Sequence, residues 1–89
     1  MEKIVFISGK RTAFGAFGGS LKDVSATDLT LTAAQGALDA GHIKADHIEH
    51  VVIGNVVQSG ADAAYVARHT GLRLGVPQNV GAYLVNRLC

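Results

Sequence analysis

Short apolar runs alternate with amphipathic stretches along this chain of 89 residues. Three runs rich in β-branched residues, at 4–7, 51–53 and 80–85, have the composition of buried strands. Between them, apolar residues recur at helical spacing after position 25 and again after position 62. The pattern predicts the order β-α-β-α-β, with crossovers that make the sheet mainly parallel. We therefore predict an α/β fold.

The first predicted helix carries its own start and stop signals. Ser25 is expected to cap the helix, and the Asp28 carboxylate to reach back to the N–H of the cap. Gly41 is expected to end the helix in a left-handed conformation.

The second predicted helix has weaker signals. Asp62 is expected to cap it, and the helix should run over 63–72. Gly71 costs about 1 kcal/mol relative to alanine inside a helix, so it is a candidate for an early end. Residues 75–77 should form the turn into the last strand.

The composition indicates a part of a larger folded body. The chain is 48% hydrophobic and 17% charged, whereas a chain of this size buries only about 60–65% of its unfolded surface. More apolar residues are present than so short a chain can hide. We therefore interpret residues 1–89 as a partial domain that packs against further protein.

Charge and cysteine content exclude several function classes. The net charge is +1 without a basic stripe, so we expect no nucleic-acid partner. Apolar runs stay far below the roughly 20 residues of a membrane span, so we expect no membrane partner. A single cysteine and an N-terminal apolar run too short for a signal peptide favour a reducing compartment. We expect a cytoplasmic location.

Chemistry in a parallel α/β sheet gathers beyond the carboxyl ends of the strands. Three segments leave such ends, at 8–20, 54–62 and 86–89. Cys89, the only cysteine, therefore lies where a reactive group should be. Two interpretations stay open from position alone, because a lone cysteine can be a nucleophile or a buried, inert side chain.

Two other candidate sites are not supported by their spacing. The glycines at 15–19 match neither the dinucleotide-binding nor the P-loop pattern, and Arg11 is better explained as an anchor of the long loop. The histidines do not match zinc-site spacings, so we expect solvated side chains and no metal site. They are His42, His47, His50 and His69.

Several segments resemble the opening of the thiolases, in order and in spacing, over essentially the whole chain. They are Lys10-Arg11-Thr12, Phe14-Gly15, Gly18 to Asp23, Gly54 to Gln58, and Val85-Asn86-Arg87-Leu88-Cys89. Residues 26–29 and 59–69 look most like the 3-ketoacyl-CoA type found in mitochondria and bacteria. Ala13 stands where many members carry proline, a difference that affects loop stiffness only.

The resemblance implies an acyltransferase with Cys89 as its nucleophile. The reaction would be thiolytic cleavage of a 3-ketoacyl-CoA to acyl-CoA and acetyl-CoA, or the reverse condensation to acetoacetyl-CoA, through an acyl-enzyme on Cys89. Coenzyme A thioesters would be substrates, and no cofactor would be bound covalently. The N–H of Cys89 would help to form an oxyanion hole, and Asn86 and Arg87 would support the turn.

The same resemblance implies that activity needs more protein. In thiolases the activating histidine, the second cysteine and most of the coenzyme A pocket lie later in the chain, so the expected partners are the remaining thiolase polypeptide and a second or further copies in a homo-dimer or tetramer. Without them Cys89 should be a poor nucleophile. The alternatives are a non-catalytic thiolase-derived fragment or interaction module, and a condensing enzyme like the ketoacyl synthases.

Overall fold

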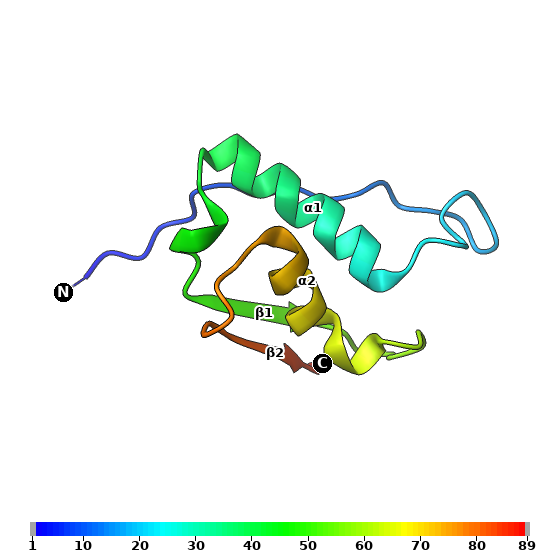
Figure 1. Ribbon diagram of the computed structural model, residues 1–89. Helices are drawn as coiled ribbons and strands as arrows, with labels where there is room; N and C mark the ends of the chain where they lie inside the picture. The colour runs from blue at the N-terminus through cyan, green and yellow to red at the C-terminus, as the bar shows by residue number, and fades with distance from the viewer. Residues whose placement is uncertain (1, 89) are drawn as a thin grey trace.

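The computed structural model describes residues 2–88 and consists of two helices, two strands and two short 3₁₀ helices. Helix α1 lies across α2, and α2 packs against the strands (Figure 1). The bounds in chain order are α1 Ala26–Gly41, η1 Ala45–His47, β1 His50–Gly54, η2 Ala63–Tyr65, α2 Val66–Leu74 and β2 Gly81–Val85.

The sheet is parallel, as the sequence predicts. β1 pairs with β2 in a register that runs from His50↔Gly81 to Gly54↔Val85. Exposure alternates along β1, where Val52 is 48% exposed and its neighbours are half-buried. The α/β class is confirmed, but the expectation of buried strands is wrong for the described residues, because α2 packs on one face of the sheet and alternate residues of β1 are exposed.

The predicted strand at 4–7 is not formed. Residues 2–10 have no regular structure, and Ile4 and Phe6 are 98% and 103% exposed. The segment runs alongside α1 (Figure 1), where the Ser8 hydroxyl donates to the carbonyl oxygen of Ala37 at 2.6 Å. An apolar run becomes a strand only where a neighbouring strand satisfies its backbone groups, and this segment lies beside α1 and pairs with neither β1 nor β2.

The start of α1 follows the sequence prediction in part. The Ser25 side chain accepts a hydrogen bond from the Asp28 N–H at 3.0 Å, so Ser25 is the N-cap. The Asp28 carboxylate does not close the capping box. It accepts instead from Nη1 of Arg73 on α2 at 2.8 Å, because the packing of the two helices brings a cation within its reach.

The end of α1 differs by one residue from the prediction. His42, not Gly41, has the left-handed conformation, with φ 54° and ψ 41°. Gly41 serves a close approach: a Cβ there would lie 3.1 Å from Oγ of Ser8. The glycine therefore makes room for the N-terminal segment beside the helix.

The second helix begins later and ends later than predicted. The 3₁₀ turn η2 precedes α2, and Asp62 makes no capping bond because its carboxylate is used elsewhere. Gly71 does not end the helix, which continues to Leu74 and closes on Gly75 at φ 94°. The buried core gathers around this helix and the first turn of α1. Its buried residues are Thr27, Ala63, Val66, Ala67, Thr70, Gly71 and Val76.

Candidate active site at the carboxyl end of the sheet

The predicted nucleophile, Cys89, lies outside the described residues, and its role stays a prediction. The described chain leaves β2 at Val85, at the same edge of the sheet where β1 ends at Gly54. The N–H of Asn55 donates to the carbonyl oxygen of Val85 at 3.1 Å. The segment that leads to Cys89 therefore starts beside the loop after β1, at the edge where ligands of parallel sheets collect.

A side-chain hydrogen bond holds the first residue beyond β2. Nδ2 of Asn86 donates to the carbonyl oxygen of Val56 at 3.1 Å, so the strand exit is joined to the loop after β1. Nη1 of Arg87 donates to the adjacent carbonyl oxygen of Asn86, also at 3.1 Å. Asn86 bonds to a distant segment, whereas the Arg87 contact is local.

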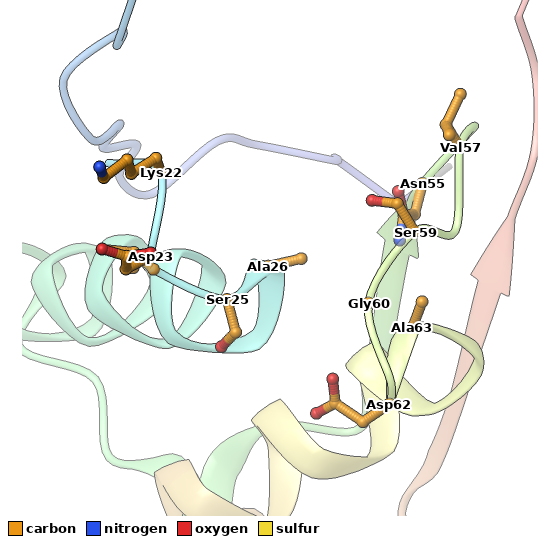
Figure 2. A pocket seen from close by; sticks show the side chains of 11 residues that line it. Lys22, Asp23, Ser25, Ala26, Asn55, Val57, Ser59, Gly60, Asp62 and Ala63 are labelled. Carbon is orange, nitrogen blue, oxygen red and sulfur yellow. The ribbon is translucent and has the colours of Figure 1, made fainter. Parts of the chain in front are cut away.

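A cavity of about 320 Å³ lies between this loop and the start of α1. Figure 2 shows Asp23 and Ser25 on the α1 side, Asn55 and Ser59 on the side of the loop, and Asp62 below. The polar side chains offer both donors and acceptors. The cavity can therefore hold a polar group between the loop after β1 and the start of α1.

Asp62 joins three elements at the far end of the loop. Its Oδ2 accepts from Oγ1 of Thr27 on α1 at 2.9 Å and lies 3.2 Å from Nδ1 of His69 on α2. Because a carboxylate only accepts, Nδ1 of His69 carries the proton. The Tyr65 ring lies over the histidine, with ring centroids 5.7 Å apart.

The cluster was missed by sequence reasoning, which assigned Asp62 to a helix cap and His69 to the helix surface. Thr27 is only 1% exposed, and most buried hydroxyls have a hydrogen-bond partner. That burial is set by the packing of α1 on α2, which no local pattern reveals.

These contacts lower the pKa of the Asp62 carboxyl. The hydrogen bond from His69 is the largest cause and the bond from Thr27 the second, while partial desolvation opposes them. A depressed folded-state pKa stabilises the fold above the ordinary carboxyl value of about 3.9, and this contribution is lost as the pH falls through the folded-state pKa.

We expect an NMR titration of the Asp62 carboxyl to give a pKa below that of an unperturbed aspartate, and His69→Phe to raise it. The substitution keeps a ring beside Tyr65 but removes the Nδ1 donor. His47→Phe, on an exposed histidine in η1, is the matched control and should leave the value unchanged. If the Asp62 pKa is the same in His69→Phe as in the unsubstituted chain, the hydrogen bond from His69 is not the cause of its lowering.

The remaining candidates are structural or unsupported. The guanidinium of Arg11 lies 5.4 Å from the centroid of the Phe14 ring, within the glycine-rich loop that it was expected to anchor. Among residues 2–88, no group of three or more metal-ligating side chains comes together. No helix in the described part of the chain has the length and apolar character to span a membrane.

Comparison with known proteins identifies what the chain resembles. Residues 4–89 match the family model described as the thiolase N-terminal domain. The chain is 57% identical over all 89 residues to the mitochondrial 3-ketoacyl-CoA thiolase of Mus musculus, and 37% identical over 89 residues to the acetyl-CoA acetyltransferase of Escherichia coli. Each match covers 100% of this chain and 22% of the relative.

Solved structures agree with these matches. The human mitochondrial 3-ketoacyl-CoA thiolase in complex with CoA superposes with a TM-score of 0.90 and 52% identity, over 93% of this chain and 21% of that one. The Acat5 thiolase of Ascaris suum in complex with coenzyme A gives a TM-score of 0.84 at 25% identity, over 91% and 21%. The chain thus spans about a fifth of the length of the relatives it matches.

The expectation of a cytoplasmic location is contradicted by these matches. The relatives from Mus musculus, Rattus norvegicus and Homo sapiens, at 57%, 56% and 50% identity, are all mitochondrial enzymes by name. The expectation rested on a single cysteine and on a short N-terminal apolar run, and neither feature distinguishes one reducing compartment from another.

Proposed function

The chain belongs to the thiolase family, and from this premise we propose that it supplies the acyl-accepting cysteine, Cys89, of a coenzyme A-dependent acyltransferase. The substrates are 3-ketoacyl-CoA and coenzyme A in the cleavage direction, or two acetyl-CoA molecules in the condensation direction. The single observation that carries the proposal is the family match, which continues through residue 89 and so includes the cysteine.

The proposed chemistry has two steps. In the cleavage direction, the Cys89 thiolate attacks the ketone carbon, an acyl–sulfur bond forms, and the carbon–carbon bond breaks to release the enolate of acetyl-CoA, which takes up a proton. The thiolate of coenzyme A then attacks the acyl-enzyme and releases Cys89. Sulfur suits both steps because the thiolate is a good nucleophile and a good leaving group. The backbone N–H of Cys89 would donate to the oxyanion.

The geometry of the described residues supports this role. Val85 and Asn86 are held at the carboxyl edge of the parallel sheet by bonds to Asn55 and Val56. The chain leaves this edge of the sheet at Asn86, three residues before Cys89 in the sequence. It is the edge where α/β enzymes place their reactive groups.

The partners follow from the length of the match. The chain spans about a fifth of its relatives, and we propose that the remaining thiolase polypeptide supplies the activating groups and most of the coenzyme A pocket, within a homo-dimer or tetramer. The relatives' names favour a mitochondrial location. A condensing enzyme of the ketoacyl-synthase kind is not favoured, because the named relatives are thiolases and acetyltransferases.

A chimeric enzyme tests the proposal. In the chimera, this chain replaces the matching segment of the Mus musculus thiolase. The two segments are 57% identical over all 89 residues of this chain. We expect the chimera to cleave acetoacetyl-CoA in the presence of coenzyme A with a kcat within about tenfold of the unmodified enzyme, since each tenfold in rate corresponds to only about 1.4 kcal/mol of barrier. A folded chimera without activity would favour a non-catalytic, thiolase-derived module.

A further inference from the structure

We propose that Asn86 is a positioning residue for the nucleophile: its side-chain amide fixes the path of the chain as it leaves β2 toward Cys89. The inference rests on the proposed function, because it assumes that Cys89 becomes acylated. It concerns a hydrogen bond between the exit of β2 and the loop after β1, from Nδ2 of Asn86 to the carbonyl oxygen of Val56.

The bond lies where the sheet ladder stops. Gly54↔Val85 is the last strand pair, and just beyond it the N–H of Asn55 donates to the carbonyl oxygen of Val85 at 3.1 Å. The Asn86 amide donates in the opposite direction, to Val56, at 3.1 Å. A side chain thus continues the cross-strand bonding for one residue after the backbone of β2 has left the sheet.

The segment beyond Asn86 has little else to hold it. Arg87 bonds only to the neighbouring carbonyl oxygen of Asn86, and the Leu88 side chain is 75% exposed. Among the described residues after β2, Asn86 is therefore the one whose side chain bonds to another element. This anchor lies three residues before Cys89 in the sequence.

The loop that receives the bond is itself held at both ends. Its start is tied to β2 by Asn55, and at its far end the Asp62 carboxylate bonds to Thr27, which is 1% exposed, and to His69. A hydrogen bond to a loop that is held in place can fix the position of the chain after β2, whereas a bond to a mobile loop could not. Through this loop, the Asn86 amide connects the end of β2 to both α1 and α2.

This arrangement predicts a distinctive phenotype. A shift of about 1 Å in a reacting group can reduce the rate about 10²-fold. A single side-chain hydrogen bond contributes only about 0.5–1.5 kcal/mol to the stability of a fold. Loss of the amide should therefore slow acylation strongly while it leaves the stability of the fold nearly unchanged.

The test measures acylation of Cys89 by acetoacetyl-CoA in single-turnover experiments on the chimeric enzyme. Asn86→Ala removes the amide, and Asn86→Asp keeps its shape but replaces the donor with a carboxylate, which only accepts. We expect both to lower the acylation rate constant by about 10–100-fold, with the burst amplitude, the KM and the melting temperature nearly unchanged. Asn86→Gln, which retains an amide, should recover part of the rate.

Two controls separate positioning from other effects. Asn79→Ala changes an exposed asparagine in the turn before β2, at the opposite end of the same strand, and should leave the rate unchanged. The pH at half-maximal acylation should be the same in Asn86→Ala as in the unsubstituted chimera, because no charge near the thiol is altered.

Each result is decisive. If the unsubstituted chimera is never acylated at Cys89, the proposed function fails and this inference with it. If the chimera is acylated and Asn86→Ala reacts at an equal rate per site, the inference is overturned while the proposed function stands. A fall in burst amplitude at an unchanged rate constant also overturns it, since it would mean fewer folded sites instead of misplaced ones.

Discussion

Cys89→Ala in the chimeric enzyme is expected to reduce kcat for acetoacetyl-CoA cleavage by at least about 10³-fold, as removal of a covalent nucleophile does. The substitution deletes the sulfur that forms the acyl bond and leaves the backbone N–H of residue 89 in place. Binding should therefore survive, and the KM should change far less than kcat.

Cys89→Ser distinguishes the nucleophile from a merely buried cysteine. A serine is nearly the same size, but its hydroxyl is far less ionised than a thiol near neutral pH and is a poorer nucleophile without a dedicated base. Loss of activity in both variants, with the melting temperature preserved, is the expected result. Full activity in the serine variant would assign Cys89 to packing.

Gly71→Leu should destabilise the chain by about 1–3 kcal/mol, the usual range for overpacking a filled core. Gly71 is buried on α2, and a Cβ there would lie 3.3 Å from Cγ2 of Val51 on β1. A larger side chain must push the helix away from the strand whose carboxyl end borders the candidate site. Urea unfolding followed by circular dichroism measures the loss.

Gly36→Leu is the matched control on α1. A Cβ at this position would lie 3.6 Å from Cγ of Lys10, a flexible side chain that can move aside. Leucine exceeds glycine in helix propensity by roughly 0.8 kcal/mol, so this substitution should be neutral or stabilising. If both leucines have the same effect on the free energy of unfolding, the close approach of α2 to β1 is not what requires glycine at position 71.

The contrast at Gly71 shows what local sequence can and cannot predict. Helix propensity alone predicts that this glycine weakens the helix, yet the helix continues to Leu74. The reason is tertiary packing: without a side chain at Gly71, α2 can approach Val51 of β1 closely. Ser25, by contrast, was predicted correctly as a cap, since capping depends on residues three apart in the chain.

Long-range partners explain the other differences. Strand formation at 4–7 depends on a pairing strand, and in the described part of the chain this segment lies beside α1 and pairs with neither β1 nor β2. Asp28 and Asp62 were both assigned to local capping. In the folded chain the Asp28 carboxylate bonds to Arg73, and the Asp62 carboxylate bonds to Thr27 and His69. Each of these partners lies at least seven residues away, beyond the reach of local pattern rules.

The candidate site was predictable in topology and not in detail. The order of strands and helices places the exits of β1 and β2 at one edge of the sheet, and this follows from the apolar pattern. The Asn86 bond to Val56 depends on the exact path of the loop after β1, which the sequence pattern does not specify. The role of Cys89 is a proposal, supported by a family match that continues through residue 89.

The most direct measurement is the location of the acyl group. The chimera is incubated with acetoacetyl-CoA in the absence of free coenzyme A, quenched in acid, digested, and analysed by peptide mass spectrometry. We predict a single acetyl thioester on the peptide that contains Cys89, removed by added coenzyme A. An acyl group carried stably by another residue, or none on Cys89 in an enzyme that still turns over, would contradict the account.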